Sequence, residues 1–413
     1  MRILQVDKFL RRQGGAASYM LDLAERQRAA GHDVEFFAMA DDDNLPATHT
    51  GSFPPHVELE PPPPGVGAKL RAARTMIWSR AAAAAMDEVV DLFRPEVAHL
   101  HNIYHQLSPS ILRPLARRNI PIVMTVHDYK LVCPSYQLLD TDGICEACLG
   151  DGGGRFHQAA LRRCKGGSLG ASALLSIEST IHRRTRAYSP VGVLIAPSEF
   201  MAAKLRESGP FPDRVRHIPN FVDTDAIEPR TGPGDGIVYV GRLAREKGVD
   251  VLIDAVARLE GVHLTIAGSG PERDALVTRA EQAAPGRVRF AGHLDKADVV
   301  ALVRSSRVAA LAARWHENMP MSIVETMAAG VPMVVTDLGG LPDLVDDGRD
   351  GFVVPAGDPD ALARALGALT GDEARAETMG AAARAKAAEV WSAPAHLEAV
   401  FSAYAAAADR LAA

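Results

Sequence analysis

The chain has few cysteines, no excess of positive charge and no long hydrophobic run, and each of these absences excludes a class of protein. Its 413 residues include 45 basic and 51 acidic side chains, a net charge of −6. A general nucleic-acid binder needs clustered Lys and Arg against the phosphates, so we expect no nucleic-acid partner. No stretch approaches the roughly 18 apolar residues that cross a bilayer. Four cysteines in a chain of this length do not make a disulfide scaffold.

The segment Met1–Val6 runs directly into a strand-like pattern without an apolar signal core, so we expect a cytoplasmic protein. Two basic runs, Arg162–Lys165 and Arg183–Arg186, leave two interpretations open. They form a solvated face, or they make a peripheral contact with anionic lipid at the inner membrane face. The sequence does not determine the oligomeric state.

Short β-branched runs alternate with helical patterns along most of the chain, which predicts α/β architecture with parallel, doubly wound sheets. Two such alternations predict two Rossmann-like domains, residues 1–190 and 191–385, followed by a C-terminal helix, 386–413, that packs back on the first domain. A segment rich in Cys and Gly, residues 133–168, interrupts the first domain. One long helix is predicted over 68–93. The predicted strands are 3–6, 34–37, 97–101, 122–127, 193–196, 237–240, 263–267, 288–290, 308–312 and 331–335.

Ligands of open parallel sheets bind at the carboxyl ends of the strands, so the residues that follow each strand are candidates. Gly14 and Gly15 begin a helix whose free N–H groups and dipole could hold a phosphate, or they form a plain turn. His127 ends a strand and is either structural or functional. Arg242 and Lys247 could bind a diphosphate, Arg as a fork and Lys as a point charge, or lie in a solvated loop.

The segment Trp315–Gly330 carries two carboxylates near the start of a predicted helix. Pro320 suits the first helical position and Gly330 suits the exit. Glu317 then lies in the preceding loop and Glu325 in the second turn, and both can point toward one cleft. There they could accept hydrogen bonds from sugar or ribose hydroxyls. The alternative is that they are acidic residues favoured by the helix dipole.

Taken together, these motifs resemble those of the retaining GT-B glycosyltransferases of glycosyltransferase family 4, over nearly the whole chain. One departure is Asn318-Met319-Pro320, where the family commonly has a glycine or an aromatic residue, which bears on the fit of the donor sugar. The resemblance is carried by Gly14-Gly15, Gly31–Val34, Val126–Asp128, Ala196–Ser198, Ile218–Asp223, Gly241–Gly248, Ala267–Pro271, Glu317, Glu325, Ala328–Pro332 and Asp350–Val354.

The resemblance implies a GT-B fold, in which two Rossmann-like domains face a central cleft, and a role for each candidate. Gly14 and Gly15 would lie against the diphosphate of a nucleotide-sugar donor. Arg242 and Lys247 would bind its charge and stabilise the leaving nucleoside diphosphate. Glu325 would hold the ribose hydroxyls.

The remaining candidates would contact the donor sugar. Glu317 would bind it from the second domain and His127 from the first. The backbone beside Glu317 would line the same site; it comprises Asn318, Met319, Pro320, Met321 and Ser322. In this family the diphosphate itself is thought to help deprotonate the acceptor, so no separate nucleophile is required.

The expected function is therefore a retaining, hexosyltransferase-type enzyme that moves a sugar from a UDP- or GDP-sugar to a hydroxyl acceptor. The acceptor would belong to a polysaccharide or glycolipid precursor or to a secondary metabolite. The alternatives are a sugar-nucleotide epimerase or hydrolase on the same fold, and a catalytically silent binding protein. We expect no catalytic metal, because each Asp-x-Asp triplet lies in a loop region; they are Asp41–Asp43, Asp140–Asp142 and Asp223–Asp225.

All four cysteines fall within the 133–168 insert: Cys133, Cys145, Cys148 and Cys164. The Cys145-x2-Cys148 spacing is of the zinc-knuckle type, and four thiolates satisfy a tetrahedral structural site. The insert has many glycines and few apolar residues, so a metal would supply stability that it lacks. Disulfides and free thiols are the alternatives to a structural zinc.

Overall fold

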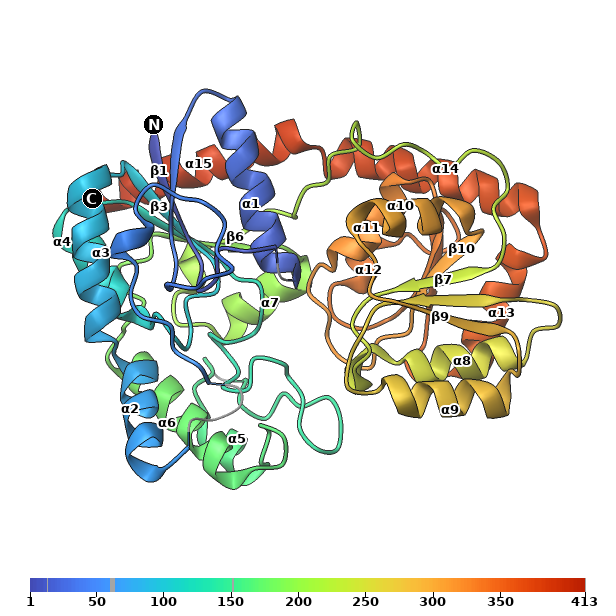
Figure 1. The fold of residues 1–413 in the computed structure, drawn as a ribbon, viewed down its shortest axis with the longest axis horizontal. Coiled ribbons are helices and arrows are strands. Elements are labelled where there is room, and N and C mark those ends of the chain that lie inside the picture. The colour runs from blue at the N-terminus through green and yellow to red at the C-terminus, as the bar shows by residue number, and fades with distance from the viewer. Residues whose placement is uncertain (13, 60–63, 151, 413) are drawn as a thin grey trace. The chain divides into compact units, whose positions relative to one another are not determined.

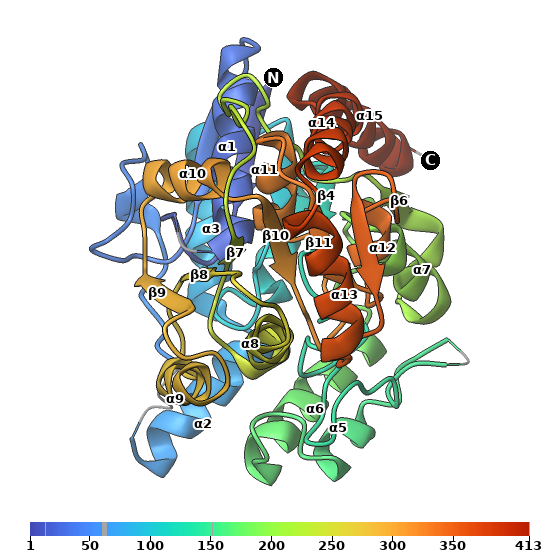
Figure 2. The same cartoon turned by 90° about the vertical axis from the view of Figure 1, so that its right-hand side faces the viewer.

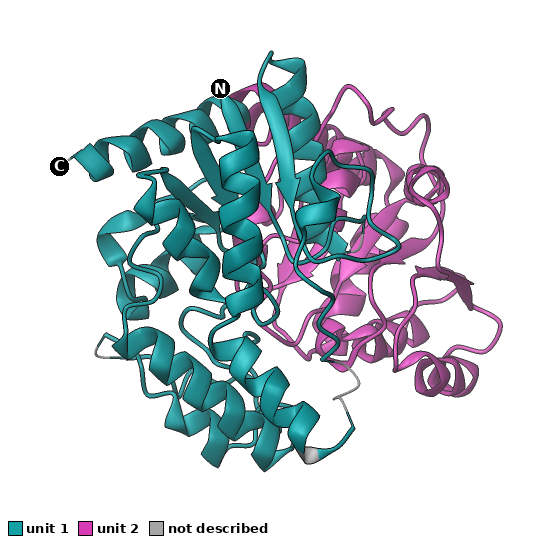
Figure 3. Ribbon diagram, turned by 60° about the vertical axis from the view of Figure 1, so that its left-hand side comes forward, with its two compact units in different colours: residues 1–218, 397–413 teal, residues 219–396 magenta. Residues whose placement is uncertain are grey.

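The computed structural model describes residues 1–12, 14–59, 64–150 and 152–412. Its elements are drawn in Figure 1. The chain forms two compact units, residues 1–218 with 397–413 and residues 219–396 (Figure 3). Each unit is built on a six-stranded sheet with parallel strands. This confirms the α/β class and the two Rossmann-like domains.

The sheet of the first unit has the strand order β2-β1-β3-β4-β5-β6, and every neighbouring pair is parallel. Strands β3, β4 and β5 are buried at every residue, which explains their mainly apolar sequences. The strands are β1 (Arg2–Val6), β2 (Asp33–Phe37), β3 (Val97–Leu100), β4 (Ile122–Thr125), β5 (Val193–Ala196) and β6 (Val215–His217).

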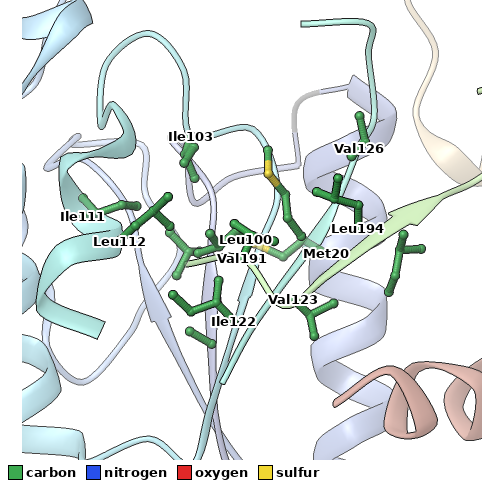
Figure 4. Packing of buried hydrophobic residues seen from close by; sticks show 14 of the residues in the cluster. Met20, Leu100, Ile103, Ile111, Leu112, Ile122, Val123, Val126, Val191 and Leu194 are labelled. Atoms are coloured by element: carbon green, nitrogen blue, oxygen red, sulfur yellow. The ribbon is translucent and has the colours of Figure 1, made fainter. Parts of the chain in front are cut away.

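Helices cover this sheet and form a hydrophobic core with it. Figure 4 shows part of that core, where Met20 from the first helix lies among Leu100, Val123 and Leu194 from three neighbouring strands. The α-helices are α1 (Gly14–Ala29), α2 (Val66–Ile77), α3 (Arg80–Phe93), α4 (Leu112–Arg117), α5 (His157–Leu161), α6 (Leu169–Arg184) and α7 (Glu199–Ser208). Short 3-10 turns are η1 (Thr50–Ser52), η2 (Pro109–Ile111) and η3 (Pro212–Arg214).

The single helix predicted over 68–93 is two helices in the structure. Helix α2 ends at Ile77, and Trp78 is extended, with φ −156° and ψ 103°. Ser79 then caps α3, because its side-chain oxygen accepts a hydrogen bond from the N–H of Ala82 at 3.1 Å. Helical periodicity continues across the break, and the capping serine is the local signal that marks it.

The first unit extends beyond the boundary at residue 190 that the sequence suggests. Strand β5 pairs in parallel with β4, and β6 pairs with β5, so both belong to the first sheet. The first unit therefore runs to residue 218, and the second begins at Pro219. The last part of α15 (Ala393–Ala412) belongs to the first unit again, where Val400 and Tyr404 are buried in its core.

The second sheet has the strand order β12-β11-β10-β7-β8-β9. The strands are β7 (Ile237–Val240), β8 (Leu264–Ala267), β9 (Val288–Gly292), β10 (Val308–Leu311), β11 (Met333–Thr336) and β12 (Gly351–Val354). The helices are η4 (Arg245–Lys247), α8 (Val249–Ala257), α9 (Arg273–Ala283), α10 (Lys296–Ser305), α11 (Met321–Ala328), α12 (Leu341–Leu344), α13 (Pro359–Thr370) and α14 (Glu373–Val390). Helix α11 packs against α14, as Figure 2 shows.

The strand order of the second sheet reverses between β7 and β10, which lie side by side. From β7 the chain builds outward through β8 and β9, and from β10 it builds the other way through β11 and β12. Loops that leave adjacent strands in opposite directions open a crevice at the carboxyl ends of those strands. The loops after β7 and β10 carry the residues that the sequence singled out in this unit.

Candidate donor site in the second unit

The loops that follow β7 and β10 are held together by their backbones. Gly248 has φ +65°, and a Cβ at this position would lie 1.8 Å from the carbonyl oxygen of Ala312. The N–H of Arg314 donates to the carbonyl of Glu246 at 2.8 Å. Only glycine permits such a close backbone approach, so Gly248 fixes the spacing of the two loops.

This arrangement brings Lys247 and Glu317 into direct contact although they are far apart in sequence. The Lys247 Nζ donates to Glu317 Oε1 at 2.6 Å, and the side chain of Glu317 is only 5% exposed. The same ammonium lies 5.3 Å from the centre of the Trp315 ring, a cation–π contact. A charge-assisted hydrogen bond of this kind orders both side chains.

The position of Glu317 is also fixed by its main chain. Its carbonyl accepts a hydrogen bond from the N–H of Gly340 at 2.7 Å, and Glu317 forms an isolated parallel bridge with Gly339. Gly339 has φ +64°, and a Cβ there would lie 2.3 Å from the carbonyl oxygen of Glu317. The glycines after β11 therefore form the support of the Glu317 loop.

Arg242 provides a second positive charge on the loop that carries Lys247. Its side chain is exposed, and among the residues that the structure describes it has no ion-pair partner. Its carbonyl accepts from the Tyr239 hydroxyl at 2.8 Å, which holds the loop in place. Burial, together with the negative charge of Glu317, raises the pKa of Tyr239, so that this hydroxyl remains a donor.

Helix α11 begins at Met321, one residue later than the sequence suggests. Pro320 has φ −67° and ψ 121°, which makes it the capping residue rather than the first helical residue. Glu325 lies in the second turn, as expected, and is half-buried. The first N–H groups of a helix, here around Met321 and Ser322, lack intrahelical partners and attract anions.

Met319 and Asn318 precede this helix. The side chain of Met319 is buried, and its sulfur accepts a hydrogen bond from the N–H of Asn220 at 3.0 Å. Met319 therefore anchors the loop to the start of the second unit, and only its backbone is available to a ligand. Asn318 is half-buried beside it.

The candidates of the first unit lie at two positions of its sheet. Gly14 is the first residue of α1, has φ +76°, and would meet no atom within 4 Å if it carried a Cβ. Gly15 is exposed beside it. His127 follows β4, is half-buried, and contacts the buried His101 and Tyr19. Burial lowers the pKa of His127 to about 3, so the ring is neutral at physiological pH.

The four cysteines lie in the first unit and none forms a disulfide. Burial, and then the neighbouring thiols, raise the pKa of Cys148 and of Cys164 to about 12. The thiols of Cys133 and Cys145 act on both of them, so the four side chains are neighbours. In the part of the chain that the structure describes, no three His, Cys, Asp or Glu side chains are arranged to hold a metal ion.

Sequence reasoning missed a buried charged cluster in the same unit. The Lys130 Nζ donates to Glu178 Oε2 at 2.8 Å, and His105 Nδ1 lies 2.8 Å from Glu178 Oε1. Burial alone would raise the pKa of the Glu178 carboxyl, but Lys130 and His105 outweigh it and lower this pKa to about 2. Lys130 lies three residues after His127 in the sequence, and this nearness is the local signal that could have identified it.

Fold and site together define a class. Two Rossmann-like units, with cations and carboxylates at the switch point of the second, make this a protein of the GT-B fold. Residues 13–226 match the family described as Glycosyltransferase Family 4, and residues 226–386 match Glycosyl transferases group 1. The chain belongs to glycosyltransferase family 4.

Individual relatives agree with this assignment. The chain is 38% identical over 164 residues to a glycogen synthase of Mycobacterium tuberculosis, a match that covers 38% of this chain and 39% of that protein. It is 33% identical over 203 residues to a GDP-mannose-dependent alpha-(1-6)-phosphatidylinositol monomannoside mannosyltransferase of Mycolicibacterium smegmatis, covering 43% and 52%. The matches thus span about two fifths to one half of these relatives.

Solved structures share the fold over the full chain. The sucrose-phosphate synthase from Thermosynechococcus elongatus has a TM-score of 0.71 at 19% identity and covers 98% of both chains. The Anabaena protein HepE in complex with UDP has a TM-score of 0.67 at 19% identity, covering 98% of this chain and 100% of that one. No described helix is long and apolar enough to span a bilayer.

Proposed function

We propose that the protein is a retaining glycosyltransferase that moves a sugar from a nucleoside-diphosphate sugar to a hydroxyl acceptor. The observation that carries the proposal is the pairing of Lys247 with Glu317 at the switch point of the second sheet, with the exposed Arg242 on the same loop as Lys247. A cation, a carboxylate and a helix N-terminus close together fit a ligand that has both phosphates and hydroxyls.

Each residue then has a defined task. The diphosphate binds to Arg242, to Lys247 and to the first N–H groups of α11, while Glu325 accepts hydrogen bonds from the ribose. Glu317 binds the donor sugar. When the glycosidic bond breaks, negative charge develops on the leaving diphosphate, and these fixed cations and dipoles stabilise it. They supply the charge stabilisation that a divalent metal supplies elsewhere.

The first unit completes the reaction in this proposal. Gly14 leaves room for the diphosphate at the start of α1, and His127 contacts the donor sugar. The leaving diphosphate takes the proton of the acceptor hydroxyl, so that the new bond forms on the face from which the old one departs. The anomeric configuration of the sugar is then retained.

The relatives suggest the donor and acceptor classes. One relative is named for GDP-mannose and for a lipid-linked acceptor, and HepE was solved with UDP, so the donor is a UDP- or GDP-sugar. The acceptor is a hydroxyl of a polysaccharide or glycolipid precursor or of a secondary metabolite.

The test is a screen of UDP- and GDP-sugars for thermal stabilisation, followed by a screen of acceptors with the donor that binds. We expect a glycosylated product whose new linkage has the anomeric configuration of the donor, detected by NMR. Inversion of that configuration would refute the retaining mechanism. Turnover of the donor to free sugar or to an epimer, with no acceptor product, would instead establish a hydrolase or an epimerase.

We also propose that Cys133, Cys145, Cys148 and Cys164 hold one structural zinc. The support is that four free thiols lie in one glycine-rich insert, where neighbouring thiols help to raise the pKa of Cys148 and of Cys164. Zinc binding would lower those two pKa values by stabilising the thiolates. Elemental analysis should find about one zinc per chain, and a Cys145→Ser/Cys148→Ser variant should lose it and melt at a lower temperature. Metal-free protein with four reactive thiols and the same melting temperature would refute the site.

A peripheral membrane contact through α5 and α6 is the remaining proposal. These helices lie side by side (Figure 1) and carry the exposed Leu161, Leu169, Ile177 and Arg184, and the exposed Arg163 lies in the turn between them. Apolar and basic side chains together fit an anionic lipid surface. Sedimentation with phosphatidylglycerol vesicles should be weakened by Leu161→Ser/Leu169→Ser. Equal sedimentation of variant and wild type, or none by either, would refute the contact.

A further inference from the structure

A line of buried polar side chains runs through the first unit from the C-terminal helix to His127. It consists of Tyr404 on α15, Gln27 on α1, Gln5 on β1 and His101 directly after β3. Gln5, Gln27 and His101 are 0% exposed, and Tyr404 is 3% exposed. Polar groups buried this deeply must satisfy one another, so the direction of each hydrogen bond constrains the next.

The direction of the line can be followed bond by bond. The Gln27 amide nitrogen donates to the Tyr404 hydroxyl at 2.8 Å, and the Gln5 amide nitrogen donates to the Gln27 amide oxygen at 2.8 Å. The Gln5 amide oxygen therefore faces His101 Nε2, 2.9 Å away, and can only accept. His101 must carry its proton on Nε2.

A neutral imidazole has one donor and one acceptor nitrogen. Burial, and then the neighbouring His99 and His127 rings, lower the pKa of His101 well below its usual range, so this ring is neutral. With its proton on Nε2, His101 offers Nδ1 as an acceptor. His127 Nε2 lies 3.0 Å from that Nδ1 and must be the donor. The two rings are stacked at 26°, with centroids 5.3 Å apart.

The other end of the line has a defined direction as well. The Tyr404 hydroxyl accepts from Gln27, so its own proton is available to His99 Nδ1 at 2.8 Å. His99 then donates from Nε2 to the Thr125 hydroxyl at 2.7 Å. Donation therefore runs in one direction, from His127 through His101, Gln5 and Gln27 to Tyr404, and from Tyr404 through His99 to Thr125.

We propose that Tyr404, Gln27, Gln5 and His101 are positioning residues that hold His127 in the Nε2–H tautomer, with Nδ1 as its hydrogen-bond acceptor. This inference rests on the proposed role of His127 at the donor sugar. An acceptor nitrogen suits a sugar hydroxyl, which can donate, and does not suit a phosphate oxygen, which cannot. The relay thus selects the part of the donor that His127 contacts.

The tautomer can be measured directly, and the measurement does not depend on activity. Long-range ¹⁵N–¹H NMR of histidine-labelled full-length protein separates protonated from unprotonated ring nitrogens, and His127→Gln identifies the His127 signals by their loss. We expect a single Nε2–H pattern for His127 at neutral pH. An Nδ1–H pattern, or an imidazolium, would overturn the proposal in the wild type without any relay variant.

The variant Gln5→Met removes the acceptor of His101 Nε2 at nearly constant side-chain volume. We expect the pure Nε2–H pattern of His127 to be lost, and the transfer rate to fall with the population of that tautomer. Tyr404→Phe interrupts the hydrogen-bonded line at its other end and serves as the second variant, should Gln5→Met fail to fold. Ser176→Ala is the matched control, because it deletes a buried hydrogen bond of 2.7 Å in the same unit that is not linked to His127.

The possible outcomes separate this inference from the proposed function. An unchanged His127 pattern in both Gln5→Met and Tyr404→Phe would refute the relay, even if the protein transfers sugar. A pattern that changes equally in Ser176→Ala would also refute it, since the effect would then be general loosening. If no transfer were ever found, the spectra would still decide the tautomer.

Discussion

Replacing Glu317 by glutamine separates the two roles assigned to the Lys247–Glu317 pair. The Lys247 Nζ lies 2.6 Å from Glu317 Oε1, and in the proposed complex it also binds the donor diphosphate. The Glu317 carboxylate and the diphosphate then compete for the same ammonium and repel one another. Glu317→Gln removes the repulsion and keeps the shape of the side chain.

The size of the effect follows from Coulomb's law. At about 6 Å and an effective dielectric constant of about 20, two unit charges repel by ~3 kcal/mol. Salt with a Debye length of about 8 Å reduces this by roughly half. Lys247 becomes less ordered without its partner, which offsets part of the gain. We therefore expect the Glu317→Gln variant to bind the bare nucleoside diphosphate about fivefold more tightly, which makes the binding free energy ~1 kcal/mol more favourable.

Transfer should change in the opposite direction, because Glu317 binds the donor sugar. Loss of a hydrogen bond to a charged group costs about 1.5–3 kcal/mol, so turnover should fall at least roughly tenfold. Glu325→Ala is the comparison variant, since loss of the ribose contact should weaken nucleotide binding at least roughly tenfold. Calorimetry with UDP or GDP measures both variants. Weakening of nucleotide binding by Glu317→Gln to the same extent as by Glu325→Ala would refute the assignment.

Three further predictions concern other parts of the chain. Arg242→Ala should weaken binding of the nucleoside diphosphate and leave that of the nucleoside unchanged in calorimetry; equal weakening would remove Arg242 from the phosphate site. Gly339 has φ +64°, and a Cβ there would lie 2.3 Å from a carbonyl oxygen, so Gly339→Ala should lower both the melting temperature and the transfer rate. Gly357 has φ +75° but no atom near its Cβ position, so Gly357→Ala should lower the free energy of unfolding by only about 1–2 kcal/mol, and its effects should be the smaller ones. Burial lowers the pKa of His396 to about 4, against about 6.5 unfolded. As the pH falls from 6.5 to 4, His396 is protonated in the unfolded chain but not in the folded protein. The free energy of unfolding therefore decreases by up to about 1.4 kcal/mol per pH unit over this range. His396→Gln, whose amide can still donate to the Pro219 carbonyl, should lose less of its melting temperature across that range than the wild type; an equal loss would contradict the burial argument.

The sequence predicted the fold because its signals are local. A buried parallel strand is a short and mainly apolar run, and the runs at β3, β4 and β5 are apolar enough to be recognised. The boundary between the units was harder to place. Strand β6 has exposed residues and joins the first sheet only through its pairing with β5, which no local pattern reveals.

The candidate site was predictable residue by residue but not as a set of contacts. Lys247 and Glu317 were each selected from their own loops, yet their ion pair depends on the close approach of Gly248 to Ala312. That approach connects segments of different strands. Sequence spacing fixes neither the distance nor the partner.

The relay behind His127 lies beyond sequence reasoning for the same reason. Tyr404 meets Gln27 across most of the length of the chain, because the end of α15 returns to the first unit. His99 in β3 and His101 directly after it are buried and form hydrogen bonds with Tyr404, Thr125 and Gln5, which are distant in sequence.

The central claim is that the second unit binds the nucleotide of the donor. A crystal structure of the full chain with UDP or GDP, whichever stabilises it more, tests this most directly. The account predicts the diphosphate on Arg242 and Lys247 and the ribose on Glu325. A nucleotide that contacts mainly residues 1–190 would contradict it.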